Sequence, residues 1–431
     1  MHNNNNETVY RLKSGKKPEL LIPAGNLDVL KVAIDYGADA VYIGGQKFGL
    51  RAKADNFSIE DMIEGADYAH NAGAKLYVTV NIFAHNDDIE GVKDYFNTIK
   101  ESGLEEKIDA FIISDPGIFT LAKKMLPGID IHISTQSNNT NYLTYNFWHD
   151  MGATRVVAAR ELSLNEIETI RNNIPDDMEI EAFMHGAMCI SYSGRCLLSS
   201  YFTGRDANKG ACTHPCRWKY SIVEEKRPGE YLPVEEDDRG TYIFNSKDLC
   251  MIEYIPEMIK AGIDSFKIEG RMKTALYVAV VTRTYRQAID DYYKDAKLYK
   301  SRMDYYREEI SACTYRQFTT GFYFHKTNEN SQIYDNNTYI KNYTYLGFVE
   351  EINDGLIKLH QKNKFSVGDE ISFMAYDGEN IHAVVKGMYD EKMTPMESAP
   401  HPKQLFYIEL EKEILQDIKK GMIIRSRHCE A

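Results

Sequence analysis

The feature that most constrains the fold is a repeated alternation of short apolar runs with amphipathic stretches between residues 18 and 270. Most of the stretches between the runs have the length and periodicity of a helix. Strands that alternate with helices predict a parallel sheet, and eight such units predict a closed, TIM-like (β/α)8 barrel. An open, doubly wound sheet is the alternative. The predicted strands are residues 19–25, 40–45, 75–81, 110–115, 131–136, 155–161, 180–186 and 265–270.

Polar residues stand where these predicted strands end. In a closed barrel of parallel strands, catalytic groups gather at the C-terminal ends of the strands. Turns begin at the same positions and are polar for their own reasons, so the pattern at Asn81 and Asp115 favours neither interpretation. The later strand ends adjoin a cysteine-rich segment, and function is the preferred interpretation for Gln136, Arg160, Glu161, His185, Glu269 and Arg271.

A long excursion, over about residues 187–264, separates the seventh predicted strand from the eighth and carries most of the chain's seven cysteines. The spacing of these cysteines matches neither a zinc finger nor a ferredoxin. A metal or iron–sulfur centre competes with buried inert thiols, with a single reactive thiol and with disulfides, which are rare in a reducing compartment. Residues alone leave these alternatives open for Cys189, Cys196, Cys212, Cys216 and Cys250.

The net charge and the composition of the chain limit the kinds of partner that it can bind. A net charge of −13 argues against an extended basic surface that wraps nucleic acid, although a local patch for an RNA loop is compatible with it. Residues 205–220 combine basic and aromatic residues suited to single-stranded RNA, with a solvated loop as the alternative. The polar N-terminus, residues 1–17, is predicted to be disordered and lacks a signal peptide. No apolar run is long enough to span a membrane, which predicts a cytoplasmic protein.

Several motifs resemble those of the U-32 peptidase family, also labelled collagenase-like. They include EAFMHGAMC (181–189), CLLSS (196–200), GACTHPCRW (210–218) and NSKDLC (245–250), together with residues 20–58, 267–290 and 316–322. The resemblance is greatest to the family's tRNA-hydroxylating branch. It implies prephenate-dependent formation of 5-hydroxyuridine at the wobble position of the tRNA anticodon loop. A peptidase and another RNA hydroxylase of the same family are the alternatives.

The resemblance also implies cofactors and site residues. It implies a [4Fe–4S] cluster held by Cys189, Cys196, Cys212 and Cys250, with Cys216 as a possible substitute ligand. Prephenate is a dicarboxylate, and guanidinium groups bind carboxylates in a two-pronged fork. The candidates for binding it are Arg51, Arg160, Arg195 and Lys267. The candidates for catalysis are His185, Glu269 and Arg271.

The rest of the chain completes the predicted organisation. Residues 18–325 form the barrel with its iron–sulfur insertion, residues 326–344 a linker, and residues 345–431 a small C-terminal β-barrel that binds RNA or protein or serves assembly. Within the excursion, residues 219–244 are predicted to form a hairpin with its turn at Pro228–Gly229, and Cys250 to open a helix over 249–261. Whether the chain acts alone or in a homo- or hetero-oligomer stays open.

Overall fold

A computed structural model of the chain describes most of its 431 residues. The described residues are 10, 12, 14–46, 48, 49, 56–189, 191, 194–217, 247–325, 340–353, 355–399 and 404–427, together with four short strands between residues 222 and 242. The N-terminal segment predicted to be disordered, the aromatic Trp218 and Tyr220, Arg51, and residues 326–339 of the predicted linker lie largely or wholly outside them. No helix in the described part of the chain is long and apolar enough to cross a membrane.

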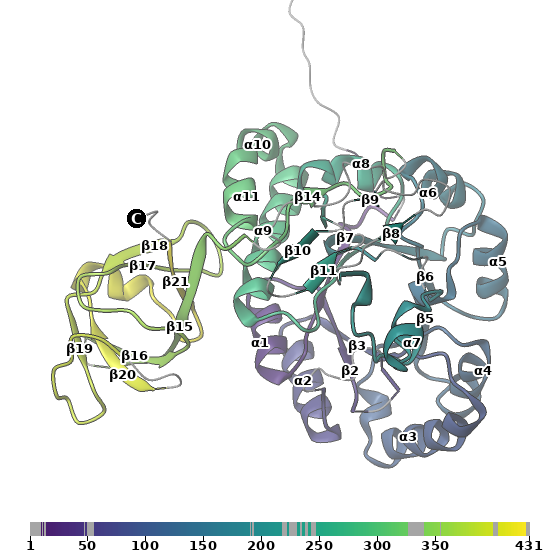
Figure 1. Cartoon of the computed structure of the whole chain (residues 1–431), viewed down its shortest axis with the longest axis horizontal. Coiled ribbons are helices and arrows are strands. Elements are labelled where there is room, and N and C mark those ends of the chain that lie inside the picture. The colour runs from purple at the N-terminus through teal and green to yellow at the C-terminus, as the bar shows by residue number, and fades with distance from the viewer. Residues whose placement is uncertain are drawn as a thin grey trace, which may run out of the picture.

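Eight parallel strands close into a barrel surrounded by helices (Figure 1). The last strand in sequence, β13, pairs in parallel with both the first and the seventh, because Lys267 stands opposite Leu21 on one side and Phe183 on the other. The closed barrel is therefore confirmed over the open sheet. The strands are β1 (Glu19–Pro23), β2 (Ala40–Gly44), β3 (Lys75–Val80), β4 (Ala110–Ile113), β5 (Asp130–Ile133), β6 (Arg155–Val157), β7 (Glu179–Ala187) and β13 (Ser265–Ile268).

Polar caps start many of the helices that follow the strands. Asn26 accepts a hydrogen bond from Val29 N, and Asp115 accepts from Gly117 N and Ile118 N, so both strand-end residues satisfy backbone donors of the next helix. These caps turn the chain sharply from strand to helix. The helices of the barrel are α1 (Leu27–Asp35), α2 (Ile59–Asn71), α3 (Ile89–Glu101), α4 (Pro116–Met125), α5 (Tyr142–Asp150), α6 (Leu164–Arg171), α8 (Ile255–Lys260) and α9 (Ala275–Lys294).

The cysteine-rich excursion leaves the barrel from the long strand β7 and returns beside it. The returning strand, β12 (Asp248–Cys250), pairs antiparallel with the end of β7, with Asp248 opposite Ala187. The prediction that Cys250 opens a helix is wrong, because the exposed edge of β7 pairs with residues 248–250 first. The excursion also contains α7 (Leu198–Thr203) and the strands β8 (Ile222–Val223), β9 (Tyr231–Leu232), β10 (Glu235–Asp237) and β11 (Gly240–Tyr242).

Short strands in the excursion pair locally. β8 pairs antiparallel with β9, and β10 pairs antiparallel with β11. The predicted turn at Pro228–Gly229 between β8 and β9 lies outside the described residues. Beyond the barrel, β14 (Phe318–Thr319) extends the sheet by pairing in parallel with β12.

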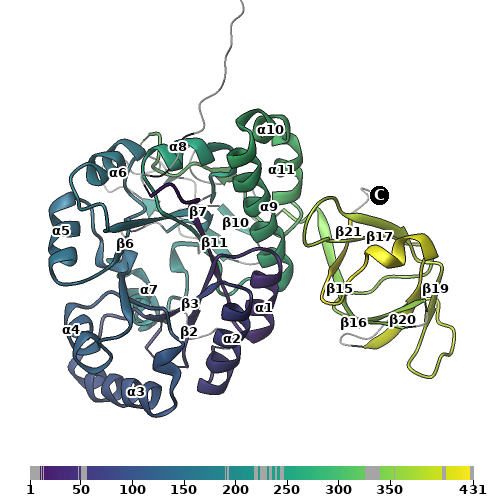
Figure 2. The same cartoon turned by 180° about the vertical axis from the view of Figure 1, so that it is seen from behind.

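The C-terminal domain is an antiparallel half-barrel of seven strands with its own apolar core. Phe373, Phe406 and Ile408 are fully buried in that core. The domain lies beside α9 and α1, on the side of the barrel away from α4 and α5 (Figure 2). Its strands run in the order β18 (Ile381–Val384), β17 (Glu370–Phe373), β21 (Ile423–Arg427), β15 (Tyr343–Asn353), β16 (Leu356–Gln361), β20 (Leu405–Glu409) and β19 (Gly387–Tyr389).

A buried polar junction joins the two domains. Glu309, on α11 (Met303–Ile310) beyond α10 (Ala296–Ser301), accepts hydrogen bonds from Arg283, from Arg425 at 2.7 Å and from Asn380 at 2.9 Å. Arg283 also donates to the carbonyl oxygen of Ala375 at 2.9 Å. Since buried charges are costly unless paired, these contacts fix how the C-terminal domain sits on the barrel.

Candidate functional site at the barrel mouth

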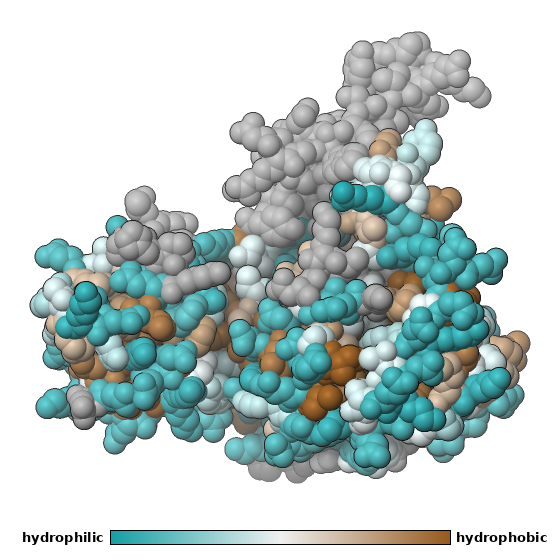
Figure 3. Space-filling model, turned by 90° about the horizontal axis from the view of Figure 1, so that it is seen from below, coloured by the Kyte–Doolittle hydropathy of each residue, from teal (hydrophilic) through white to brown (hydrophobic). Residues whose placement is uncertain are grey.

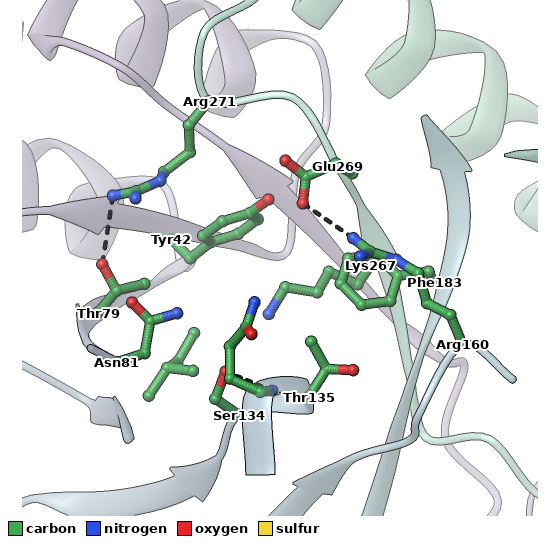
Figure 4. Close-up of a pocket in the computed structure, with 12 residues that line it drawn as sticks. Tyr42, Thr79, Asn81, Ser134, Thr135, Arg160, Phe183, Lys267, Glu269 and Arg271 are labelled. Atoms are coloured by element: carbon green, nitrogen blue, oxygen red, sulfur yellow. Dashed lines mark hydrogen bonds and ion pairs between the residues drawn. The ribbon is translucent and has the colours of Figure 1, made fainter. Parts of the chain in front are cut away.

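A pocket that opens to solvent lies at the C-terminal ends of the barrel strands, and Figure 4 shows side chains from several strands facing it. Most of the lining is polar or charged. The lining residues are Tyr42, Thr79, Asn81, Ile112, Ser134, Thr135, Gln136, Arg160, Phe183, Lys267, Glu269 and Arg271. The structure thus brings together five of the polar strand-end residues singled out in the sequence. Asn26 and Asp115 instead cap helices.

Lys267 connects the pocket to a buried ionic network below it. Its Nζ donates to Glu181 Oε1 at 2.5 Å and lies 4.5 Å from the centre of the Tyr42 ring. Glu181 is completely buried and also accepts from Arg155, which pairs with Glu19 at 2.6 Å. Burial alone would raise the pKa of Glu19, but Arg155, together with Tyr77 and Lys75, outweighs burial and lowers the pKa. The network therefore holds Lys267 in place at the pocket floor.

Arg271 enters the pocket through space that two glycines leave open. A Cβ atom on Gly44 would lie 1.9 Å from Arg271 Nη1, and one on Gly25 would lie 2.3 Å from the Arg271 carbonyl oxygen. The guanidinium donates to Thr79 Oγ1 at 3.2 Å, and Arg271 as a residue is only 6% exposed. Any larger residue at Gly44 would displace this guanidinium.

Arg160 and Glu269 form the other side of the pocket. Arg160 Nη2 lies 3.2 Å from Glu269 Oε2, and the guanidinium stacks 3.8 Å from the centre of the Phe183 ring. The side chains are 13% and 17% exposed, so the pair is largely shielded from water. Stacking and pairing together hold the guanidinium flat against the pocket wall.

The pocket lining holds three cationic side chains and one carboxylate. Arg160 follows β6, whereas Lys267 lies in β13 and Arg271 follows it, and all three face one space together with hydroxyl and amide groups. An arrangement of this kind suits an anion with more than one carboxylate, because guanidinium groups bind carboxylates in a directional fork. The described lining contains no histidine or cysteine.

His185 does not line the pocket. Between Phe183 and His185 the pairing of β7 with β13 shifts by one residue, so that Lys267 faces Phe183 whereas Ile268 faces His185. This bulge turns the His185 ring away from the pocket and toward Tyr277, Tyr285 and Phe318. Burial lowers the pKa of His185 to about 4. The structure thus brings Glu269 and Arg271 together and leaves His185 in the barrel wall; the catalytic roles stay predictions.

The four residues predicted to bind prephenate lie in different places. Lys267 and Arg160 line the pocket, whereas Arg51 lies outside the described residues. Arg195 is exposed and follows Gly194, where an added Cβ would lie 2.2 Å from the carbonyl oxygen of Gln136. Arg195 therefore stands at the rim of the pocket.

The predicted cluster ligands lie along the excursion. Cys189 is exposed, and Cys196, Cys212, Cys216 and Cys250 are half-buried. Burial raises the pKa of Cys250 to about 12. These soft sulfur donors fit an iron–sulfur cluster in kind. Among the described residues, however, no three His, Cys, Asp or Glu side chains are gathered closely enough to hold a metal ion.

Several pocket residues were missed in the sequence. Tyr42 and Thr79 lie inside predicted strands, and Ser134 and Thr135 lie within a predicted strand end. Thr79 interrupts an apolar run at alternate spacing, which is the pattern of one inward-facing polar residue. Tyr42, whose hydroxyl donates to Ile268 O at 2.9 Å, gives no sign in the sequence that it faces the pocket.

The fold and the pocket define a TIM-like barrel protein with a cation-rich site at its mouth. The family model described as peptidase family U32 matches residues 25–333, and that of the U32 C-terminal domain matches residues 341–425. Together the two models span nearly the whole described chain. The chain belongs to peptidase family U32.

Three curated relatives are similar to much of the chain. The tRNA hydroxylation protein P1 of Bacillus subtilis (strain 168) is 40% identical over 93% of this chain and 93% of its own length. The tRNA hydroxylation protein P of Escherichia coli (strain K12) is 39% identical over 89% of this chain and 92% of its own length. The 23S rRNA 5-hydroxycytidine C2501 synthase of Escherichia coli (strain K12) is 39% identical over 64% of this chain and 40% of its own length.

Proposed function

We propose that this chain is an RNA hydroxylase that forms 5-hydroxyuridine at the wobble position of tRNA and uses prephenate as co-substrate. Relatives similar over nine-tenths of the chain are named for tRNA hydroxylation, and a more partial relative is named for forming 5-hydroxycytidine in ribosomal RNA. The shared element of these names is hydroxylation of a pyrimidine in RNA. The enzyme would meet its tRNA in the cytoplasm.

The observation that carries the proposal is the set of three cations at the pocket. Prephenate bears two carboxylates, and Arg160, Lys267 and Arg271 provide directional donors on different sides of one space. Lys267 and Arg271 are nearly buried, so a carboxylate placed between them meets little competition from water. Glu269, beside Arg160 at 3.2 Å, is the carboxylate placed to accept a proton there.

The cysteine excursion is proposed to hold a [4Fe–4S] cluster through Cys189, Cys196, Cys212 and Cys250, with Cys216 as a substitute ligand. When bound, such a cluster supplies one-electron transfer. Cys196 lies two residues after Gly194, whose backbone packs on the pocket-lining Gln136.

Nucleoside analysis of tRNA tests the proposal. Deleting the gene for this chain is expected to remove 5-hydroxyuridine from total tRNA, and supplying the wild-type chain is expected to restore it, as measured by mass spectrometry. An unchanged 5-hydroxyuridine level in the deletion strain would contradict the proposal that this chain hydroxylates tRNA.

A second strain tests whether prephenate is the co-substrate. In cells unable to make prephenate, 5-hydroxyuridine is expected to disappear and to return when prephenate synthesis is restored. Persistence of 5-hydroxyuridine in these cells would leave an RNA hydroxylase whose pocket takes another anion.

A further inference from the structure

Helix α7, within the cysteine excursion, exposes an unusual set of apolar side chains. Leu197, which precedes the helix, is 72% exposed, and Tyr201, one turn later, is 83% exposed. The neighbouring ring of Phe202 is 42% exposed and lies 5.0 Å from that of Tyr201 in an edge-to-face arrangement. A tyrosine this exposed contributes almost nothing to the core, so its ring is available to a partner.

Hydrogen bonds keep this exposed edge rigid. The buried Ser199 Oγ lies 3.0 Å from Thr213 Oγ1, and Thr203 Oγ1 donates to the carbonyl oxygen of Ser199 at 2.7 Å. Thr213 N also donates to Ser199 Oγ at 3.1 Å. The ring of Tyr201 is therefore presented by a tied helical turn, which lowers the entropy lost when a ligand stacks on it.

The helix stands at the rim of the pocket. Phe83 N, beyond the end of β3, donates to Asn208 O at 3.3 Å, and Lys209 pairs with Asp88 at 2.8 Å. Gly194, four residues before the helix, packs on the backbone of Gln136, which lines the pocket. In Figure 1, α7 lies in front of the C-terminal ends of the barrel strands. The segment that carries α7 is therefore attached to the pocket rim near Gln136.

Exposed arginines bracket the apolar edge. Arg195 precedes the helix and Arg205 follows it, and both are exposed. Lys209, by contrast, already pairs with Asp88. In a chain of net charge −13, two exposed arginines beside two exposed rings form a local surface of positive charge and π faces. Single-stranded RNA binds such surfaces through stacked bases and contacted phosphates.

We propose that the exposed edge of α7, formed by Leu197, Tyr201 and Phe202 between Arg195 and Arg205, binds single-stranded RNA by stacking a base next to the nucleotide that enters the pocket. This inference rests on the proposed RNA hydroxylase function. An enzyme that modifies a base must move that base out of the stack it forms with its neighbours. The neighbouring base then loses a stacking partner, and an aromatic ring at the rim of the pocket replaces that partner. Tyr201 supplies that platform, and the two arginines contact the flanking phosphates.

A protein partner fits this edge less well than RNA. Side chains of this size bury roughly 150–250 Å² each when fully covered. Three of them fall short of the roughly 800 Å² per partner that a stable protein interface buries. The flanking arginines add positive charge, which suits the phosphate backbone of RNA.

A fluorescent RNA hairpin tests the stacking. The probe is an anticodon stem-loop with uridine at the wobble position and 2-aminopurine at an adjacent position, added to the full-length protein. Stacking on Tyr201 is expected to quench the probe, and Tyr201→Ala is expected to abolish the quenching and weaken binding about tenfold. Tyr201→Phe keeps the ring and should behave like wild type. The matched control is Tyr142→Ala, which removes a tyrosine that is 38% exposed on α5.

The outcomes separate this inference from the proposed function. If wild-type protein hydroxylates tRNA but Tyr201→Ala binds the hairpin as tightly as Tyr142→Ala, the inference is overturned and the function stands. If wild-type protein neither binds the hairpin nor restores 5-hydroxyuridine, both fall. If Tyr201→Ala instead dissociates an oligomer, measured by light scattering, while its affinity for the hairpin is unchanged, the edge serves a second copy and the inference is overturned.

Discussion

The domain junction and the barrel interior both bury arginines against glutamates, yet only the network in the barrel reaches an opening. At the junction, Arg283 and Arg425 are each 1% exposed and both pair with Glu309. In the barrel, the chain of contacts runs from Glu19 and Arg155 through Glu181 to Lys267, whose side chain lines the pocket. One network ends within the protein, and the other ends at the pocket.

The difference teaches what each network does. Buried ion pairs add little net stability over apolar packing, but breaking one partner is costly. At the junction that cost enforces a single orientation of the C-terminal domain. In the barrel it holds an ammonium group in a fixed place where a carboxylate can reach it. The same chemistry therefore fixes a domain at the junction and holds a cation at the pocket in the barrel.

Removing the central carboxylate of the junction has the largest expected effect. Glu309→Ala leaves Arg283 and Arg425 buried without their shared partner, and should lower the free energy of unfolding by about 3–5 kcal/mol in urea titrations. The neighbouring Glu308→Ala is the matched control. Glu308 forms an exposed pair with Arg427, so its loss should cost at most about 1 kcal/mol. Equal effects of the two substitutions would contradict the structural role of the junction.

Removing the pocket cation should affect activity more than fold. Lys267→Met keeps most of the side-chain volume but deletes the ammonium group, and formation of 5-hydroxyuridine should fall about 100-fold, or about 2.7 kcal/mol. The readout is the initial rate with purified protein and tRNA, alongside urea unfolding. Lys124→Met, which alters an exposed lysine on α4, is the control. If Lys267→Met were as active as Lys124→Met, the cation at the end of the barrel network would have no role in the reaction.

The pH dependence of the junction gives the smallest and most specific effect. Burial alone would raise the pKa of Glu309, but Arg425 and Arg283 outweigh it and lower the pKa. The stabilisation is therefore complete above the carboxyl's usual pKa and is lost as the pH falls through the lowered value. Near neutral pH, Glu309→Gln should lower the free energy of unfolding by roughly 2 kcal/mol.

Urea titrations at successively lower pH provide the measurement. The difference between wild type and Glu309→Gln should shrink as the pH drops below the usual carboxyl pKa, because the carboxyl is protonated first in the unfolded chain and, below the lowered pKa, in the folded protein as well. A difference that stays constant across this range would mean that the charge of Glu309 does not stabilise the junction.

Periodicity in the sequence was enough to predict the barrel. All eight predicted strands exist, because alternation of β-branched runs with helices reflects burial on both faces of a parallel sheet. Strand ends likewise pointed to Arg160, Glu269 and Arg271, since parallel strands deliver their C-terminal ends to one rim. These inferences depend on local pattern and on a general rule of barrel geometry.

What the sequence could not predict depends on details of pairing. His185 stands at a strand end, but a single bulge in β7 turns its side chain away from the pocket. No pattern in residues 180–186 predicts that bulge. Leu249 and Cys250 were assigned to a helix because the pairing partner of their strand, the far end of β7, is distant in sequence. Helix α7 is too short for periodicity to reveal it, so Tyr201 went unnoticed.

The pairing of Asp248 with Ala187 has a consequence for how this family can vary. The excursion leaves and rejoins the barrel at two residues that face each other on adjacent strands, so its two ends are fixed side by side whatever lies between them. Lengthening a loop whose ends are already held together costs little free energy. Evolution can therefore rebuild this segment without moving any strand of the barrel beneath it.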